Sequence, residues 1–172
     1  SHSNITLLKN QKNLGFAGGV NTGIRYAIDS GYEFVALINN DATPEPNWLE
    51  ELCNPMINRS VGICTGKLLK TDGTIDSTGD QYTSWGLAYP RGRNDKDSGQ
   101  YDTVQEVFGA TGGASLYRIE MLEQIGLFDE NFFAYYEDVD ISFRAQLAGW
   151  KVIYNPKAVA HHTVEATRGN VP

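Results

Sequence analysis

An aspartate that follows directly on an apolar run is the first residue of this sequence that could bind a metal. Asn39, Asn40 and Asp41 come immediately after the apolar residues 34–38. Ligands of open α/β sheets bind at the carboxyl ends of strands, and a magnesium ion needs only one or two protein carboxylates when phosphate oxygens and water complete its shell. Asp41 alone could therefore hold such an ion. The same Asn-Asn-Asp run, with Pro44 after it, is equally typical of a simple turn.

Three carboxylates stand at the start of a predicted helix, in the run Tyr-Tyr-Glu-Asp-Val-Asp of residues 135–140. Acids in a first helical turn complement the helix dipole and cap free N–H groups, and Asp140 is spaced to pair with Arg144. The flanking tyrosines, however, suit an apolar pocket with a polar floor. Because Glu137 and Asp138 are adjacent, they point in different directions, so one could act as a base while the other anchors the loop.

A histidine pair, His161 and His162, follows a short apolar segment near the end of the chain. On its own, such a pair is more often a surface or core feature than a site. If Asp41 holds a cation, one imidazole could complete the shell of that cation. The other would face away, because neighbouring residues of a strand alternate between its two sides.

Two glycine-rich segments, residues 14–19 and 109–114, could bring the backbone close to a ligand. Neither contains the Gly-Lys-Ser/Thr of a phosphate-binding loop, and neither matches the G-x-G-x-x-G of a dinucleotide-binding turn. Tight turns alone would explain either segment.

The apolar pattern predicts the elements that must position these groups. Short or continuous apolar runs predict strands at residues 5–8, 34–39, 61–69, 114–117, 151–154 and 158–160. Apolar periodicity and end signals predict helices at about residues 20–30, 46–55, 120–125 and 138–148. Residues 78–103 read as a long loop or a weak hairpin, of the kind that is usually functional. Strands that alternate with helices favour an α/β fold with a mainly parallel sheet.

The composition excludes several classes of protein. A net charge of −7, from 14 Lys and Arg against 21 Asp and Glu, leaves no basic stripe for nucleic acid. Two cysteines are too few for a disulfide framework or a four-cysteine metal site, which favours reduced thiols in the cytoplasm. The longest apolar run, residues 34–38, is far too short to span a membrane.

Taken together, several blocks of the sequence resemble the family-2 inverting glycosyltransferases, especially their rhamnosyltransferase-like branch. The first block, NLGFAGGVNTGI, is similar to the opening signature of that family, and a later block ends in its Glu-Asp motif. The resembling segments, in chain order, are residues 13–24, residues 36–41 with Pro44 and Trp48, residues 109–117, residues 125–144 and residues 150–162.

This resemblance implies a GT-A nucleotide-diphospho-sugar transferase fold, with a mainly parallel central sheet and helices on both faces. It implies an inverting, metal-assisted transfer of a sugar from a nucleotide-diphosphate donor to a hydroxyl of a saccharide or lipid-linked acceptor. The implied cofactor is Mg²⁺ or Mn²⁺. The implied location is the cytoplasm, including peripheral association with the inner face of the membrane.

The resemblance also assigns roles to single residues. Asp138 would be the general base, with Glu137 beside it. Asp41 would hold the metal together with His161 or, as second choice, His162. The residues that the resemblance places near the nucleotide or the donor sugar are Asn13, Gly18, Asn21, Asn39, Asn40, Gly112 and Gly113.

Two features depart from the family pattern. The metal segment keeps Asp41 as its only acid, which predicts a weaker metal affinity. The opening strand, helix and second strand of the family are not found ahead of residue 5, so residues 1–172 are expected to form one catalytic domain without its N-terminal βαβ unit. We therefore expect weak or no nucleotide binding by residues 1–172 alone, which calorimetric titration with nucleotide diphosphates and Mn²⁺ would test.

Two other functions stay open at this point. A sugar nucleotidyltransferase could use a similar sheet, although it needs a basic glycine-rich loop and residues 14–20 contain no Lys or Arg. A non-catalytic carbohydrate-binding module could stack sugars on Tyr82, Trp85 and Tyr89. Replacing Asp138 by Asn would separate this last function from catalysis, because a binding module would keep its whole activity.

Overall fold

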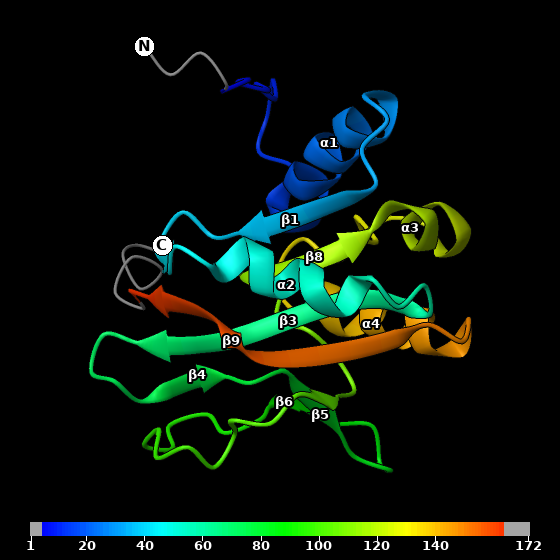
Figure 1. The fold of residues 1–172 in the computed structure, drawn as a ribbon. Coiled ribbons are helices and arrows are strands. Elements are labelled where there is room, and N and C mark those ends of the chain that lie inside the picture. The colour runs from blue at the N-terminus through cyan, green and yellow to red at the C-terminus, as the bar shows by residue number, and fades with distance from the viewer. Residues whose placement is uncertain (1–4, 164–172) are drawn as a thin grey trace.

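A computed structural model describes residues 5–163 as an α/β fold (Figure 1). The elements, in chain order, are α1 (Gly15–Asp29), β1 (Phe34–Ile38), β2 (Ala42–Pro44), α2 (Trp48–Met56), β3 (Val61–Lys70), β4 (Ile75–Ser77), β5 (Asp80–Tyr82), β6 (Ala88–Pro90), β7 (Gln105–Glu106), β8 (Ala114–Arg118), α3 (Ile119–Ile125), α4 (Glu137–Leu147) and β9 (Lys151–His162).

The main sheet is mixed, whereas the sequence predicted a mainly parallel one. Its strand order is β1-β8-β3-β9-β2, with β4 paired to β3 and β7 paired to β9. Among the described pairs only β3 and β9 are parallel, because β8 enters between β1 and β3 in the opposite direction. The apolar pattern of a strand indicates how it is buried but not the direction of its partner, which is why this part of the prediction was wrong. The α/β class is confirmed.

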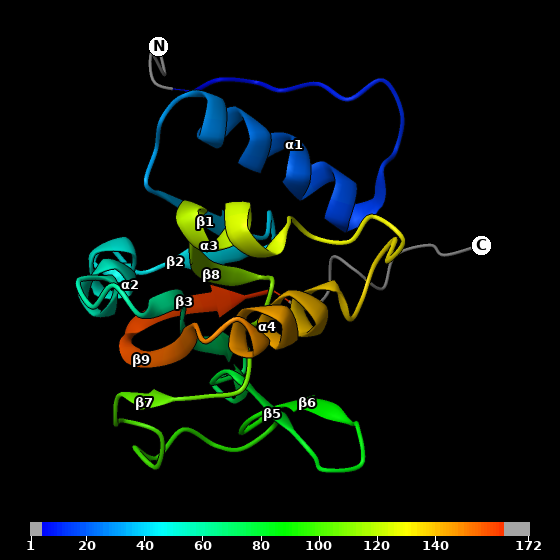
Figure 2. The same ribbon diagram turned by 90° about the vertical axis from the view of Figure 1, so that its right-hand side faces the viewer.

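Helices cover both faces of this sheet, as predicted. On one face α2 buries Trp48, Leu52 and Met56 against strand residues that include Cys64 and Leu116. On the other face α1, α3 and α4 pack over a second apolar cluster, and Figure 2 shows α2 and α4 on opposite sides of the sheet. Each fully buried side chain of this size contributes about 1.5–3 kcal/mol to folding. The two clusters therefore fix the strand ends from both sides.

The long segment between β4 and β8 carries a hairpin. The sequence predicted either a long loop or a weak hairpin there. Strands β5 and β6 pair with each other in a small separate sheet, seen below the main sheet in Figure 2. Lys67 of β3 ties the segment down through Asp97 at 2.9 Å and Asp102 at 2.6 Å. The guanidinium of Arg91 lies over the rings of Tyr101 and Tyr154. These contacts of the buried Lys67 and Arg91 hold the segment against the main sheet.

Strand β9 is one long strand where the sequence predicted two short ones. Its pairing with β3 jumps from Thr65–Tyr154 to Lys67–Val159, so β9 bulges where it passes Gly66. A Cβ atom at Gly66 would lie 1.9 Å from the carbonyl oxygen of Ala158, so no other residue fits there. The bulge lets β9 continue to His162.

Two further boundaries differ from the sequence prediction. Residues 5–8 form no strand, and the side chains of Ile5 and Leu7 are exposed. An apolar run needs a neighbouring strand to become one, and residues 5–8 pair with none of the described residues. Helix α1 begins at Gly15, inside the segment predicted as a loop, because Gly15 with a φ of 71° lets the chain turn directly into the helix.

Candidate active site

A pocket of about 510 Å³ opens where the end of β1, the start of α4 and strand β6 come together. The walls include five residues that the sequence singled out, Asn39, Gly112, Gly113, Glu137 and Asp138. They come from three segments that are far apart in the chain. The fold therefore brings the end of the predicted metal-binding strand and the predicted base to one cavity.

Two backbone donors hold the carboxylate of Asp138. The N–H of Gly112 donates to Oδ2 at 3.0 Å, and the N–H of Val139 donates to Oδ1 at 2.9 Å. A Cβ atom at Gly112 would lie 3.2 Å from the ring of Phe16 and 3.5 Å from the Cβ of Asp138. The glycine thus allows the backbone to approach the acid closely.

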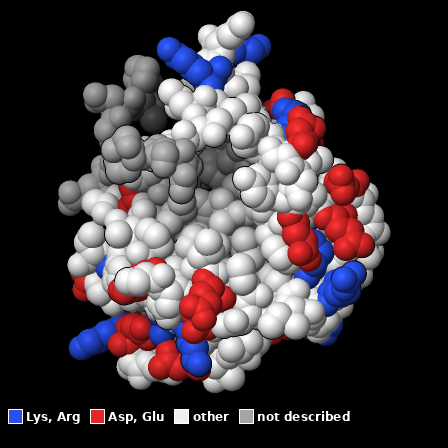
Figure 3. Space-filling view, turned by 45° about the horizontal axis from the view of Figure 1, so that its top comes forward, with Lys and Arg blue, Asp and Glu red and all other residues white. Residues whose placement is uncertain are grey.

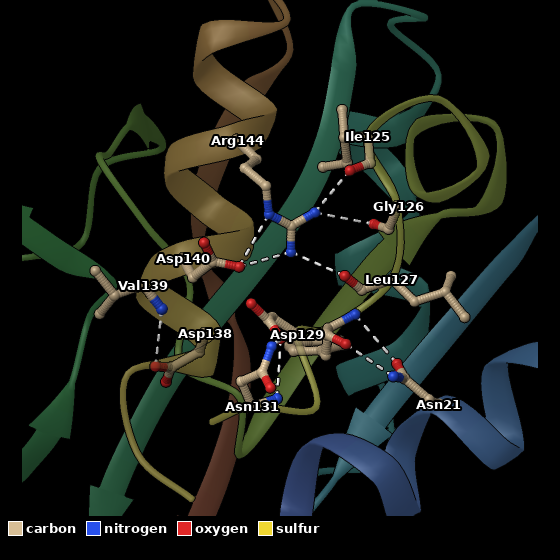
Figure 4. A network of polar contacts seen from close by, with 11 residues as sticks. Asn21, Ile125, Gly126, Leu127, Asp129, Asn131, Asp138, Val139, Asp140 and Arg144 are labelled. Carbon is tan, nitrogen blue, oxygen red and sulfur yellow. Dashed lines mark hydrogen bonds and ion pairs between the residues drawn. The ribbon is translucent and has the colours of Figure 1, made fainter. Parts of the chain in front are cut away.

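Helix α4, which carries this acid, is fixed by Arg144 (Figure 4). The guanidinium donates to Asp140 at 2.7 and 2.9 Å, which confirms the predicted pair. It also donates to the backbone carbonyls of Ile125, Gly126 and Leu127 at 2.8–3.1 Å. One side chain therefore locks the first turns of α4 to the end of α3.

The chain enters α4 through two tyrosines with left-handed backbones. Tyr135 has a φ of 73° and Tyr136 a φ of 70°, a region that costs free energy for residues other than glycine. Both line the pocket and both are exposed. Just before them, the carbonyl of Phe133 accepts a hydrogen bond from the N–H of Phe16 at 2.8 Å. The entry is thus tied to α1, and the aromatic walls expected from the sequence are present.

Glu137 lines the same pocket but is more deeply enclosed. Its side chain is buried, and its Oε2 has no hydrogen-bond partner among the described residues. Burial raises the pKa of this carboxyl above its ordinary value, and the neighbouring charge of Asp138 adds to the effect. Glu137 and Asp138 therefore differ in surroundings although they are adjacent.

A third acid, Asp80 of β5, faces the same space and was not singled out from the sequence. Its backbone bridges to Gly109, with its N–H donating to the Gly109 carbonyl at 2.8 Å. Only 5% of the residue is exposed. Burial, together with the charge of Asp138, raises the pKa of Asp80 to about 7. Asp80, Glu137 and Asp138 are called the acid centre below.

A second polar cluster, Asp41, Asp76 and His162, is called the histidine centre below. The Nε2 atom of His162 lies 3.2 Å from Oδ1 of Asp41, and its Nδ1 lies 2.8 Å from Oδ2 of Asp76. His161 points elsewhere, since its Nε2 meets Glu45 at 2.8 Å. The side chain of His162 is 15% exposed and that of His161 46%. The structure therefore places His162, the second choice of the sequence analysis, beside Asp41.

Arg93 connects the histidine centre to the pocket. Its Nη2 lies 3.1 Å from Oδ1 of Asp76, and its Nε donates to the Asp76 carbonyl at 3.2 Å. Arg93 itself lines the pocket, as does Asn39, two residues before Asp41. Asp41 does not line the pocket. The histidine centre therefore borders the cavity rather than forming its wall.

The donor set of the histidine centre fits a divalent cation. An ionised Asp76 can only accept a hydrogen bond, so it takes the Nδ1 proton of His162 and leaves a lone pair on Nε2. That Nε2 is buried, has no hydrogen-bond partner among the described residues and faces Asp41. Two acceptors at this distance need a cation or a proton between them, and a carboxylate behind the imidazole is the usual support of a metal-binding histidine. Within residues 5–163 no three His, Cys, Asp or Glu side chains are placed to hold a metal ion together. Asp41 and His162 would therefore be two ligands, and phosphate oxygens and water would supply the others.

Four residues expected near the donor lie outside the pocket lining. Asn13 accepts a hydrogen bond from Gly15, and Asn40 is exposed at the turn after β1. Gly18 is buried inside α1, where a Cβ atom would lie 2.7 Å from that of Leu14. The Asn21 side chain is occupied by the segment after α3: it donates to the carbonyl of Phe128 and accepts from its N–H (Figure 4).

Sequence reasoning missed Asp76, Asp80 and Arg93, all of which belong to the segment between β3 and β7. No periodicity marks that segment, and its length was the only signal that it is functional.

Acidic side chains stand in groups around the margin of the hollowed face in Figure 3. Most of the described basic side chains on this face lie beside acidic ones, which agrees with the absence of a basic stripe in the sequence.

The chain resembles curated glycosyltransferases over most of its length. It is 29% identical over 154 residues to the low-salt glycan biosynthesis hexosyltransferase Agl10 of Haloferax volcanii, covering 85% of this chain and 48% of the relative. It is 27% identical over 194 aligned positions to an N-acetylglucosaminyl-diphospho-decaprenol L-rhamnosyltransferase of Mycobacterium tuberculosis, covering 96% of this chain and 61% of the relative. The chain thus spans about half the length of the curated relatives it matches.

Solved structures share the fold. GalNAc-T7 with UDP, GalNAc and Mn²⁺ matches with a TM-score of 0.69 at 15% identity, over 91% of this chain and 32% of that protein. The mannosyltransferase PcManGT of Pyrobaculum calidifontis, in complex with GDP-Man and Mn²⁺, matches with a TM-score of 0.63 at 19% identity, over 95% of this chain and 40% of that protein. These matches confirm the expected GT-A fold. The model named "Glycosyltransferase like family 2" matches residues 1–170, and the chain belongs to that family.

Proposed function

We propose that this chain is the catalytic part of an inverting glycosyltransferase that moves a sugar from a nucleotide-diphosphate donor to an acceptor hydroxyl. The observation that carries the proposal is the pocket lined by Asp138, Asn39 and Arg93. Arg93 contacts Asp76, which pairs with His162 beside Asp41, so the histidine centre borders the same pocket. A proton acceptor and a cation site at one cavity are what a single displacement on an activated sugar requires. The family and the names of the relatives support the same reaction class.

The donor diphosphate would lie on the side of the histidine centre. Asp41 and His162 would hold Mg²⁺ or Mn²⁺, with Asp76 orienting the imidazole. When bound, such a cation offsets the negative charge of the diphosphate leaving group. Arg93, whose charge faces the pocket next to Asp76, would add to that effect. The two structural neighbours that were solved with UDP or GDP-Man also contain Mn²⁺.

The acceptor hydroxyl would approach Asp138. A sugar hydroxyl is a poor nucleophile, so a carboxylate within hydrogen-bond reach must take its proton during attack. The two backbone donors keep the Asp138 carboxylate in place for that role. An in-line attack inverts the anomeric carbon without a covalent enzyme intermediate, as in other single-displacement sugar chemistry. Gly112 and Gly113 would leave room for the donor sugar between the two centres.

The acceptor would be a saccharide, either free or attached to a lipid. The mycobacterial relative is named for an acceptor that joins N-acetylglucosamine through a diphosphate to decaprenol. None of the helices within residues 5–163 has the length and apolar character of a membrane span. The proposal places this chain in the cytoplasm, with peripheral contact to the inner face of the membrane for a lipid-linked acceptor.

A transfer assay tests this function with the whole natural polypeptide. It is incubated with Mn²⁺, a panel of UDP-, GDP- and dTDP-sugars and a panel of methyl pyranosides, and proton NMR follows the anomeric signals. We expect one donor to yield a glycoside of inverted anomeric configuration, and chelation of the metal to stop the reaction. A retained configuration, or no turnover of any donor either to a glycoside or to free sugar, would contradict the proposal.

A further inference from the structure

The Asp80 carboxyl is a buried acid that the reaction outlined above does not use. Only 5% of the residue is exposed, it lines the pocket, and no described residue donates a hydrogen bond to its carboxyl. A carboxyl that is nearly enclosed and has no protein partner is costly, and a ligand in the pocket would complete it. Because Asp80 lines the pocket together with Asp138, the missing partner would come from a molecule inside that pocket.

Asp80 also separates the pocket from a second hollow. This hollow has a volume of about 480 Å³ and shares Asp80 and Tyr89 with the pocket. Its other walls include Tyr82 and Phe108, whose rings stack with their centroids 4.5 Å apart, and the polar side chain of Gln105. Aromatic rings beside hydrogen-bonding side chains suit the apolar faces and hydroxyl edges of a sugar.

We propose that Asp80 is an acceptor-positioning residue, whose carboxyl binds a hydroxyl of the acceptor sugar next to the hydroxyl that Asp138 deprotonates. This inference rests on the proposed function, because it takes Asp138 as the base. In that arrangement one carboxyl accepts the reacting proton and the other fixes the ring through a neighbouring oxygen. A second sugar of a longer acceptor would continue over Tyr89 into the second hollow.

The position of Asp80 favours the acceptor over the donor. The donor diphosphate belongs with Asp41 and His162, which reach the pocket through Arg93 and Asn39. Neither Arg93 nor Asn39 lines the second hollow, whereas Asp80 does. Asp80 therefore lies between Asp138 and the second hollow, which none of the residues on the donor side lines.

The charges around Asp80 agree with this role. Asp138 raises the pKa of Asp80 and Arg93 lowers it, while burial is the largest effect and brings the pKa to about 7. Near neutral pH the carboxyl therefore carries a proton for much of the time. A protonated carboxyl can donate to an acceptor oxygen and still accept a hydrogen bond, so it can bind a hydroxyl in either direction.

Kinetics of D80A in the whole natural polypeptide test the proposal, with the donor and methyl pyranoside that serve the wild type best. We expect the KM for the methyl pyranoside to rise about tenfold to hundredfold, the usual cost of losing a hydrogen bond to a buried carboxyl. The KM for the donor and the rate of donor hydrolysis to water should change less than twofold. The matched control is D72A, which removes an exposed aspartate from the turn after β3 and should change neither KM.

Acceptor analogues show whether the effect comes from a direct contact. For wild type we expect one monodeoxy methyl pyranoside, lacking the hydroxyl next to the attacking one, to lose about tenfold or more in kcat/KM. D80A should discriminate against the same analogue less than twofold, because the contact is already lost. D80S keeps a polar atom, but its side chain is too short to reach the acceptor. It should also discriminate against the analogue less than twofold, and it replaces D80A if D80A does not fold.

Three outcomes would overturn the inference. An acceptor KM within threefold of wild type would show that Asp80 does not hold the acceptor, and an equal rise in the donor KM would assign Asp80 to the donor. Undiminished discrimination against every deoxy analogue in both variants would show that the contact does not exist. Each of these leaves the proposed function intact, whereas absence of any transfer or hydrolysis by wild type would overturn both.

Discussion

The two polar centres that border the pocket are built on opposite principles. In the histidine centre each carboxylate faces a nitrogen, since Asp41 and Asp76 lie on either side of the His162 ring and Asp76 also meets Arg93. In the acid centre three carboxyls are grouped with few partners: Asp80 has no side-chain hydrogen bond and Glu137 has a buried oxygen without one, within the described residues. Only the Asp138 carboxylate has hydrogen-bond partners on both oxygens, and these are backbone N–H groups, not positively charged side chains.

Under the proposed function, this difference would separate metal binding from proton transfer. A cluster with balanced charges keeps its geometry and would offer a fixed pair of ligands to a cation. In the acid centre, burial instead raises the pKa of Asp80 and of Glu137. Groups with a pKa close to neutrality are those that exchange protons at physiological pH. In the proposed reaction, one cavity would thus combine a rigid site for a cation with a place for proton transfer.

Loss of the base should give the largest effect of any single substitution. We expect D138N to lower kcat for glycosyl transfer about a thousandfold, since general base catalysis typically contributes 10²–10⁴-fold. The amide keeps the shape of the side chain but can accept only one of the two backbone hydrogen bonds. Because the variant leaves Asp41 and His162 unchanged, the Mn²⁺ and nucleotide-diphosphate affinity of the whole natural polypeptide should stay within twofold of wild type. Single-turnover kinetics and calorimetric titration measure the two quantities. If D138N kept more than a tenth of the wild-type kcat, the acid centre would not be the place of proton transfer.

The histidine pair offers a matched test of the other centre. We expect H162A to weaken Mn²⁺ binding at least tenfold and up to about a hundredfold, because removing even a supporting group of a metal ligand has an effect of that size. H161A should bind Mn²⁺ as wild type does, since its imidazole meets Glu45 away from Asp41. Titration of Mn²⁺ followed by electron paramagnetic resonance gives both dissociation constants. Equal weakening by the two variants would rule out His162 as the specific ligand.

The acid centre should destabilise the protein as the pH rises. Asp80 keeps its proton in the folded state up to a pH of about 7, whereas in the unfolded chain it loses the proton near its ordinary value of 3.8. Between these values the folded state binds more protons, so the free energy of unfolding falls as the pH rises. D80N lacks this penalty and should be more stable than wild type at pH 8, by up to about 4 kcal/mol.

Urea denaturation at two pH values measures this difference. At pH 4 the free energies of unfolding of D80N and wild type should be almost equal. At that pH Asp80 is protonated in the folded state and partly protonated in the unfolded state, so folding changes its protonation little. A gap that is the same at pH 4 and pH 8 would show that the substitution acts through packing and not through the charge.

The smallest expected effect concerns Asn21, which lies outside both centres. N21A removes the partners of the backbone N–H and carbonyl of Phe128, and we expect the free energy of unfolding to fall by about 2 kcal/mol. Affinity for nucleotide diphosphates should change less than twofold, since the side chain is buried against the segment after α3. Denaturation and calorimetry check the two parts. A large loss of nucleotide affinity without loss of stability would return Asn21 to the donor site.

Local pattern singled out two of the residues that the structure brings near the pocket. Acids beside aromatic residues at a helix start drew attention to Asp138, and the preceding apolar run drew attention to Asp41, while the roles of both stay predictions. Asp76, Asp80 and Arg93 were missed because they lie in a polar segment with no period, and only tertiary pairing brings them to the pocket. The antiparallel entry of β8 could not be predicted for the same reason, since strand direction depends on where a distant segment returns.

The bulge in β9 precedes the two adjacent histidines, of which His162 faces Asp41. Side chains of a strand alternate, so a change of one residue between Tyr154 and Val159 that the bulge does not absorb would turn His161 inward and His162 outward. If His162 is a metal ligand as proposed, the length of this stretch matters to the site, although none of its residues belongs to either centre. In a related chain with a different number of residues there, the inward-facing ligand should be sought by counting from the irregularity, not by aligning the histidines.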